Sequence, residues 1–239
     1  MASTIVVGAC GRMGQLVCAT VEADDALELV GRYDVDNIEE LDEQAPAADL
    51  VIDFSSPAAL AHVAAYVRRT GAALASGTTG MTEDDLAQLR ELGQKSRVVW
   101  SSNYSLGVAV LRRVAAQAAR ALQDWDVEIV ETHHNQKADA PSGTAKALLE
   151  SVDPTGACAV AYGREGIVGA RPAREIGMHA LRGGTVAGTH EVHFFGTDEE
   201  VCLTHRAASR QIFVSGAVAC AKRLLAAEPG LHTFDDLMF

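Results

Sequence analysis

Short apolar runs alternate with helix-like stretches over the first hundred residues, and this alternation constrains the fold most strongly. Five runs have the length of β-strands: Ile5–Val7, Leu27–Tyr33, Leu50–Phe54, Ala72–Ser76 and Val98–Trp100. Leu50–Phe54 is apolar except at Asp53, which is typical of a strand covered on both faces. Helix-like segments begin near Met13, Pro57 and Thr82. The alternation predicts a parallel, doubly wound sheet of Rossmann-like α/β type.

The pattern changes after about Tyr104, which indicates a second domain. A helix is predicted over 106–122, followed by a strand at Val127–Thr132. Residues 175–206 are strand-like, and "THEVHFF" and "EEVCLTH" flank Gly196-Thr197-Asp198, which predicts an antiparallel hairpin. A last helix is predicted over Gly216–Glu228. We therefore expect an α+β domain with a mixed or antiparallel sheet after the α/β domain.

A glycine-rich loop, "GACGRMG", follows the first predicted strand and contains Gly8, Gly11 and Gly14. The spacing alone is weak, because glycines also serve ordinary strand-to-helix turns. Asp34 lies 20 residues after Gly14, directly after the second strand, where a carboxylate could bind ribose hydroxyls. The order of strand, loop, helix, strand and acid predicts a dinucleotide site, with the phosphates at the helix start. No Gly-Lys-Ser/Thr ending follows, so the loop is not a P-loop.

The residues near Asp34 leave the choice of cofactor open. Asp34 would repel a 2′-phosphate and favours NADH, and Val35 offers that phosphate no cation. Arg12, inside the glycine loop, could instead reach toward a 2′-phosphate and allow NADPH. We expect NADH, NADPH or both to be used.

The segment "ETHHNQKADAPSGTAK", Glu131–Lys146, predicts a second site. His133 and His134 end a strand and Lys137 follows, while Pro141 favours a loop over 135–141. Ser142 is a candidate N-cap, which would place the backbone N–H groups of the next two residues at a helix start suited to a carboxylate. A histidine exchanges protons near neutral pH, so the cluster predicts proton transfer beside a bound anion.

Metal binding is not expected from the spacing of the histidines and cysteines. His133 and His134 are adjacent on a strand and should point to opposite faces, and His190 and His193, three apart, should do the same. The five cysteines show no Cys-x-x-Cys spacing. An odd number of unpatterned cysteines indicates reduced thiols, and thus a cytoplasmic protein.

Charge and hydropathy exclude several classes of partner. The net charge of −12 argues against broad binding to nucleic acid or to anionic membranes. Six of the ten residues from Asp34 to Glu43 are acidic, and we expect a solvated loop there. No run approaches the roughly 18 apolar residues of a membrane span, and the N-terminus has no basic leader, so no signal peptide is expected.

Taken together, these motifs resemble the 4-hydroxy-tetrahydrodipicolinate reductase (dihydrodipicolinate reductase) family, over essentially the whole chain. The similar segments occur in the same order: "VVGACGRMG", "VIDFSSP", "GTTG", "SSNYSLGV", "ETHHNQKADAPSGTA", "YGREG", "IGMHALRGGTVAGTHEV" and "LTHRAASRQIFVSGAV". The resemblance implies an NAD(P)H-dependent oxidoreductase of lysine and diaminopimelate biosynthesis. It also implies a dinucleotide-binding domain at 1–104 and 211–239. Residues 105–210 would then bind the substrate and form a homotetramer through their β-sheet.

The resemblance also implies roles for individual residues. His133 would be the proton donor or acceptor and Lys137 a second proton donor, while His134, Gly143 and Thr144 would bind the carboxylates of a cyclic dicarboxylate substrate. The residues implied to contact the cofactor are Gly8, Ala9, Cys10, Gly11, Arg12, Met13, Asp34, Gly77, Thr78, Thr79, Ser101, Ser102, Asn103 and Tyr104.

The chain departs from the family pattern in three places. Val35 stands where a basic residue is common, Tyr104 where phenylalanine is common, and the segment between Asp34 and Leu50 is shorter than in many relatives. Two alternative functions stay open: another imine or amino-acid dehydrogenase of this architecture, and, less favoured, a dinucleotide-sensing protein without catalysis.

Overall fold

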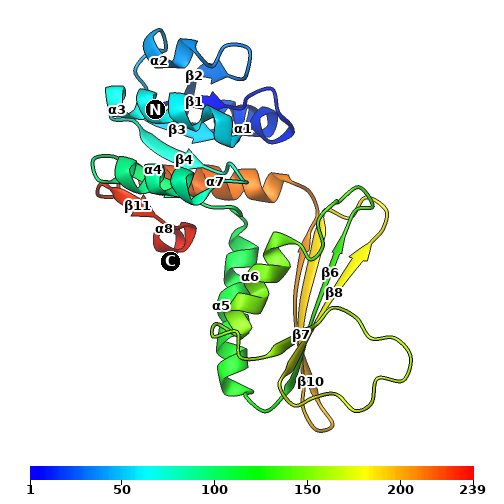
Figure 1. The fold of residues 1–239 in the computed structure, drawn as a ribbon. Helices are drawn as coiled ribbons and strands as arrows, with labels where there is room; N and C mark the ends of the chain where they lie inside the picture. The colour runs from blue at the N-terminus through cyan, green and yellow to red at the C-terminus, as the bar shows by residue number, and fades with distance from the viewer. The chain divides into compact units, whose positions relative to one another are not determined.

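A computed structural model describes residues 1–239, which form two compact units (Figure 1). Unit 1 consists of Met1–Ser105 and Gln211–Phe239, and unit 2 of Leu106–Arg210. The first boundary falls one residue later than the resemblance implies, and the second falls at the implied residue. The chain thus leaves the first unit once and returns to it.

The sheet of unit 1 is six-stranded and entirely parallel, with strand order β11-β5-β4-β3-β1-β2 (Figure 1). Its strands are β1 (Ala2–Val7), β2 (Leu27–Tyr33), β3 (Leu50–Asp53), β4 (Ala73–Ser76), β5 (Arg97–Trp100) and β11 (Gly230–His232). The strand order reverses at β1, so this sheet confirms the predicted doubly wound α/β fold. Every residue of β3 and β4 is buried, as expected for strands covered on both faces.

The helices of unit 1 lie on both faces of this sheet. They are α1 (Arg12–Glu22), α2 (Glu40–Glu43), η1 (Pro57–Ala59), α3 (Leu60–Thr70), α4 (Glu83–Gly93), α7 (Gln211–Leu224) and α8 (Phe234–Met238). Helix α1 packs beside α7, whereas α3 packs beside α2 and α4. A core that includes Val51, Val63 and Leu89 fills the space between the sheet and the α3–α4 layer. Thr82 begins α4 with a reciprocal capping box to Asp85, which explains the helix start predicted there.

Three sequence expectations for unit 1 were wrong or incomplete. The last long helix begins at Gln211 and not Gly216, and it ends at Leu224 and not Glu228. Gly216 therefore lies inside this helix. A Cβ at this position would lie 1.7 Å from the carbonyl oxygen of Tyr104, so only glycine permits such close packing. Strand β11 and helix α8 follow, and neither was expected. The acidic segment after Asp34 contains α2, whose Leu41 is fully buried in the core.

Unit 2 is built on a mixed five-stranded sheet with strand order β10-β9-β6-β8-β7. Its strands are β6 (Asp126–His133), β7 (Ala159–Ala161), β8 (Glu175–Arg182), β9 (Gly188–Phe195) and β10 (Glu200–Ala207). The β6–β9–β10 pairs are antiparallel and the β6–β8–β7 pairs are parallel. The predicted hairpin is confirmed, since the backbone N–H of Gly196 donates to Glu199 across the β9–β10 turn at 2.9 Å.

Two helices, α5 (Leu106–Ala121) and α6 (Gly143–Val152), pack against one face of the unit 2 sheet. Strand alternation sends Ile129 and His133 toward these helices, where a core forms around Ile129, Met178 and Phe194. Glu128 and the other alternate residues lie on the opposite side, which we call the outer face. Side chains on the same face of the sheet can therefore contact one another, whereas those on opposite faces cannot.

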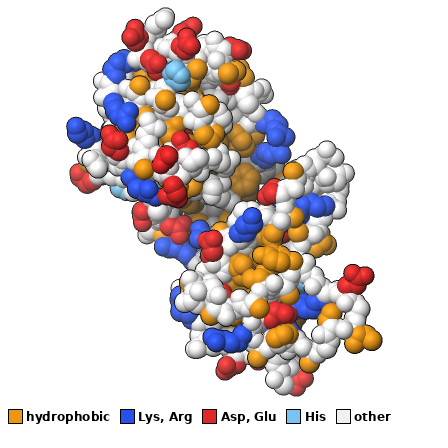
Figure 2. Space-filling model, in the orientation of Figure 1, with side chains coloured by type: hydrophobic (Ala, Val, Ile, Leu, Met, Phe, Trp, Pro, Cys, Tyr) orange, Lys and Arg blue, Asp and Glu red, His pale blue; other side chains and the backbone are white.

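The surface carries charges of both signs. On the face that Figure 2 shows, Lys and Arg side chains are scattered among Asp and Glu, in a chain of net charge −12. None of the helices combines the length and apolar character that a membrane crossing requires. A site for an anionic ligand must therefore gather its positive charge locally.

Candidate functional site

The glycine loop lies at the carboxyl end of β1, where it leads into α1. Gly8 has φ +77°, and a Cβ on it would lie 2.6 Å from the carbonyl oxygen of Phe54. A Cβ on Gly14 would lie 2.0 Å from the carbonyl oxygen of Gly8. Helix α1 starts after Gly11 without a side-chain cap and without an acidic residue in its first turn. These features fit a pyrophosphate, because an uncapped helix start offers N–H donors and a positive dipole end.

Asp34 lies directly against this loop. One of its carboxylate oxygens accepts from the backbone N–H of Cys10 at 2.8 Å, and the other accepts from that of Val35 at 2.8 Å. Val35 is 81% exposed, and Arg12 is exposed at the first position of α1. The structure therefore brings the acid and the glycines together, as the sequence predicts for a ribose-binding carboxylate.

The ends of β3 and β4 are joined by a buried hydrogen-bond network around Asp53. Its carboxylate accepts from the hydroxyls of Ser76 and Thr78, both at 2.8 Å. A Cβ on Gly77 would lie 2.3 Å from the ring of Phe54. This network shapes the loop 77–79 at the same sheet edge as the glycine loop, with Thr79 exposed.

The segment Ser101–Tyr104 follows β5 at this edge. The Tyr104 ring packs against Phe54 and Phe234, and its hydroxyl donates to the carbonyl oxygen of Ser76 at 2.8 Å. Burial raises the pKa of Tyr104 well above its usual value. Ser101 accepts from the N–H of Asn103 at 3.2 Å, and Ser102 is exposed. Thr78 and Tyr104 are each only 1% exposed, so their side chains support the core.

The histidine cluster of unit 2 is centred on a buried carboxylate, Glu131. Glu131 and His133 are two residues apart on β6 and share its helix-facing side. Glu131 Oε2 lies 2.6 Å from Nδ1 of His133. An ionised carboxylate can only accept, so Nδ1 carries the proton and Nε2 is the nitrogen left to act. A Cβ on Gly188, where φ is +155°, would lie 3.1 Å from this Nε2.

Arg182 holds Glu131 through two hydrogen bonds, one from each terminal guanidinium nitrogen, both 2.8 Å long. Burial alone would raise the pKa of Glu131, but hydrogen bonds from Arg182, His133 and the N–H of Ser142 outweigh it and lower the pKa. Arg182 also donates to the carbonyl oxygen of Asp139 at 2.7 Å. Glu131 is thus ionised at neutral pH and fixes both His133 and the following loop.

Ser142 begins α6 as predicted, since its hydroxyl accepts from the N–H of Ala145 at 3.2 Å. The same oxygen lies 3.1 Å from Nε2 of His190. Burial, followed by the nearby charge of His133, lowers the pKa of His190 to about 4, so His190 is neutral at pH 7. Gly143 is exposed at the helix start, and no atom lies within 4 Å of the position a Cβ would take. Ser142 and His190 therefore fix the start of α6, and the space beside Gly143 is open to a ligand.

Lys137 lies in the loop between β6 and α6. Its ammonium group is 2.7 Å from a carboxylate oxygen of Asp139 and lowers the pKa of that carboxyl group. His134 follows the end of β6, half-buried, with its backbone N–H bonded to the carbonyl oxygen of Val186 at 2.8 Å. The loop between β6 and α6 thus carries both Lys137 and His134, two of the predicted site residues.

Sequence reasoning missed Glu131, Arg182 and His190 as members of this cluster. Glu131 was detectable, because residues two apart on a strand share a face and His133 was already a candidate. Arg182 was not, because only the parallel register of β6 and β8 places it opposite His133.

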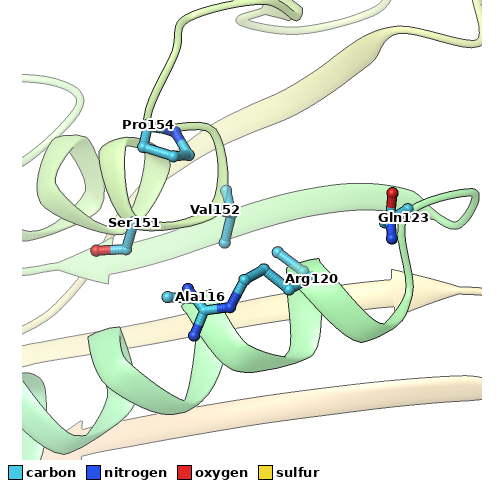
Figure 3. Close-up of a pocket in the computed structure, with 7 residues that line it drawn as sticks. Ala116, Arg120, Gln123, Ser151, Val152 and Pro154 are labelled. Carbon is cyan, nitrogen blue, oxygen red and sulfur yellow. The ribbon is translucent and has the colours of Figure 1, made fainter.

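A separate hollow of about 550 Å³ lies on unit 2 near the ends of α5 and α6 (Figure 3). Arg120 and Gln123 line it from the α5 side, and Ser151 and Pro154 from the α6 side. It lies at the opposite end of α6 from Ser142, so it is not part of the histidine cluster.

Comparison with known proteins decides the family. The family model described as "Dihydrodipicolinate reductase, N-terminus" matches residues 2–104, and "Dihydrodipicolinate reductase, C-terminus" matches residues 107–238. The chain belongs to the dihydrodipicolinate reductase family.

Relatives that match along the full length support this. The 4-hydroxy-tetrahydrodipicolinate reductase of Methanosarcina mazei is 38% identical, over all of this chain and 99% of its own length. The protein of the same name from Akkermansia muciniphila is 40% identical, over all of this chain and 98% of its own length.

Solved structures share the fold. The dipicolinate-bound dihydrodipicolinate reductase of Paenisporosarcina sp. TG-14 superposes with a TM-score of 0.81 at 22% identity, with both chains covered completely. An amine dehydrogenase of Mycobacterium smegmatis superposes with a TM-score of 0.63 at 12% identity, over 98% of this chain and 95% of its own. The two-unit fold therefore also occurs in dehydrogenases outside the reductase family.

Proposed function

We propose that this protein reduces 4-hydroxy-tetrahydrodipicolinate to tetrahydrodipicolinate with NADH or NADPH, in lysine and diaminopimelate biosynthesis. Membership of the reductase family supports this function. The structural observation that carries it is the Glu131–His133 pair, 2.6 Å apart, beside the α6 start capped by Ser142. His133 would transfer the proton, and the backbone N–H groups at the start of α6 would bind a carboxylate of the substrate.

The cofactor would be held by unit 1. Gly8–Met13 would bind the pyrophosphate at the start of α1, and Asp34 would bind ribose hydroxyls. Gly77–Thr79 and Ser101–Tyr104 would complete the site from the same sheet edge. When bound, NADH or NADPH supplies the hydride for the reduction.

The substrate would be held by unit 2 through its two carboxylates. Backbone N–H groups of Gly143 and Thr144, the ammonium group of Lys137 and the ring of His134 are the groups we assign to them. Lys137 would exchange its contact with Asp139 for the substrate. The Paenisporosarcina enzyme binds dipicolinate, a planar cyclic dicarboxylate, which supports a ligand of this class.

His133 would pass the proton in this reaction. Its Nδ1 is bonded to Glu131, so Nε2 is the atom that would face the substrate. Glu131 and Arg182 prevent the ring from rotating, and Gly188 leaves room beside Nε2. Lys137 would serve as the second proton donor.

The proposal is tested by initial rates of NADH and NADPH oxidation with the freshly prepared cyclic imine, beside a panel of 2-keto acids with ammonia. We expect turnover with the cyclic imine and none with the keto acids. Turnover of a keto acid in its place would indicate another dehydrogenase of this fold. Binding of NADH without turnover of any imine would indicate a sensing protein.

Asp34→Ala should raise the KM for NADH more than that for NADPH, with a smaller change in kcat. The ribose hydroxyls lose a hydrogen-bond acceptor, whereas a 2′-phosphate loses a repelling charge. KM values for both cofactors check this. Asp36→Ala, an exposed acid two residues further on, is the matched control and should change neither value. Equal effects on both cofactors would show that Asp34 does not discriminate between a 2′-hydroxyl and a 2′-phosphate.

We further propose a cytoplasmic homotetramer that associates through the sheet of unit 2. Leu181 is 49% exposed and Phe195 40% exposed, and both lie on the outer face of that sheet. Exposed apolar side chains on an uncovered sheet favour association with another copy. The five free cysteines suit a reducing compartment.

A further inference from the structure

Asp53 is a buried acid at the end of β3, and its side chain lies between two of the proposed cofactor loops. Strand β3 pairs with β1 on one side and with β4 on the other. The glycine loop follows β1, and the loop Gly77–Thr79 follows β4. Only 1% of Asp53 is exposed, and a carboxylate so deeply buried needs hydrogen-bond donors around it.

The donors to this carboxylate come from both neighbouring segments. Oδ1 of Asp53 accepts from the backbone N–H of Ser55 at 3.0 Å and from the hydroxyl of the same residue at 2.5 Å. Oδ2 accepts from the hydroxyls of Ser76 and Thr78, both at 2.8 Å. The first oxygen thus fixes the chain directly after β3, and the second fixes the end of β4 and the loop that follows it.

The segment fixed by Oδ1 packs tightly against the glycine loop. The backbone N–H of Phe54 donates to the carbonyl oxygen of Val7 at 3.0 Å. A Cβ on Gly8 would lie 2.6 Å from the carbonyl oxygen of Phe54 and 2.8 Å from Cα of Ser55. Since this contact leaves no room for even a methyl group, a shift of Phe54 and Ser55 toward Gly8 must move the glycine loop as well.

The loop fixed by Oδ2 is held from two sides. The backbone N–H of Gly77 donates to the carbonyl oxygen of Asp53 at 2.8 Å, and the hydroxyl of Thr78 donates to the Asp53 carboxylate. From the other side, Nε1 of Trp100 donates to the carbonyl oxygen of Thr78 at 2.9 Å. Thr79, the next residue, is exposed. Asp53 and Trp100 therefore fix the backbone from which Thr79 is presented at this sheet edge.

We propose that Asp53 is a positioning residue for the dinucleotide, which holds the glycine loop and the loop Gly77–Thr79 in one fixed arrangement. This inference rests on the proposed function, because both loops are assigned there to NADH or NADPH. Asp53 acts through the loops and not by contact with the cofactor, since its side chain is buried. A site that is already ordered binds its ligand more tightly, because less conformational freedom is lost on binding.

Asp53→Asn keeps the shape of the side chain but cannot accept all of these bonds. The amide has one oxygen and an NH₂ group that only donates. With the NH₂ at the Oδ1 position, it would face the backbone N–H of Ser55, which also only donates. With the NH₂ at the Oδ2 position, the hydroxyl protons of Ser76 and Thr78 would lose their acceptor. In either orientation a buried donor loses its partner, which favours rearrangement of a loop.

The experiment measures the binding of NADH and NADPH to the purified full chain by isothermal titration calorimetry, without substrate. Asp53→Asn should raise the dissociation constant of each cofactor that the unaltered protein binds by about tenfold or more, the equivalent of one buried donor left unpaired. The KM for the cyclic imine at saturating cofactor should not change, because the groups assigned to the substrate belong to unit 2. Ser55→Ala removes a single hydroxyl donor and should raise the same dissociation constants by about threefold.

Asp49→Asn is the matched control, at the opposite end of the same strand. Asp49 directly precedes β3, and its carboxylate accepts from the backbone N–H and the hydroxyl of Ser3, both at 2.8 Å. This variant should lose stability, as Asp53→Asn should, but its dissociation constants for the cofactors should match those of the unaltered protein. Urea unfolding shows whether each variant is folded under the conditions of the titration.

Unchanged cofactor binding in Asp53→Asn would overturn the proposal, as would an equal loss of affinity in Asp49→Asn, which would indicate a general loosening of unit 1. If Asp53→Asn does not fold, unchanged binding in Ser55→Ala overturns it. Each of these results leaves the proposed function standing, provided that the unaltered protein turns over the cyclic imine. Weaker binding in Asp53→Asn alone, in a protein that turns over no imine, would support the role of Asp53 and contradict the proposed function.

Discussion

His133→Ala and Lys137→Ala are each expected to lower kcat with the cyclic imine by at least about a hundredfold, the usual contribution of a positioned acid or base. In the first variant the Nε2 that we propose passes the proton is missing, and in the second the ammonium group that we assign to the substrate is missing. Steady-state rates with saturating NADH or NADPH measure the effect. Circular dichroism and denaturant unfolding show whether each variant is folded.

Lys146→Ala is the matched control for the lysine. Lys146 lies on α6, only a few residues from the same helix start, but it is exposed, and its side chain makes none of the hydrogen bonds described for the cluster. We expect its kcat to stay within about twofold of the unaltered protein, as for surface changes away from a site. Near-normal activity in both the His133 and Lys137 variants would contradict the assigned site.

Glu131→Gln is expected to act on both stability and catalysis. The amide cannot balance the charge of Arg182, and breaking a buried ion pair from one side costs about 3 kcal/mol in the free energy of unfolding. The amide can also donate to Nδ1 of His133, which would move the ring proton to Nε2. We therefore expect kcat to fall at least tenfold and the pH profile of kcat to change shape.

Glu128→Gln separates these two effects. Glu128 lies on the same strand but on the outer face, where hydrogen bonds from Arg164, His179 and Arg171 overcome the opposing effect of burial and lower its pKa to about 2. This variant should also lose stability, but its kcat and pH profile should stay normal because His133 is untouched. Urea unfolding and pH-rate profiles of both variants give the comparison. A Glu131 variant that loses only stability would show that the carboxylate does not position His133.

Several features follow from the sequence alone, because they depend on contacts between residues that are near in the chain. Apolar runs such as Leu50–Asp53 reveal buried strands, and glycines at Gly8 and Gly14 reveal a loop with no room for side chains. The turn at Gly196 pairs β9 with β10, and Ser142 caps α6 through its own third neighbour. The α/β class, the second mixed sheet, and the family were predictable on these grounds.

Other features were decided only by the tertiary structure. The start of α7 at Gln211 depends on packing against α1, which is nearly two hundred residues away in the chain. Arg182 meets Glu131 only through the parallel register of β6 and β8, and Cys202 lies opposite His193 only through the antiparallel register of β9 and β10. Local periodicity shows which face a side chain takes, but strand pairing and register choose its partners. The side chains around Glu131 were therefore visible in the sequence, whereas their pairings were not.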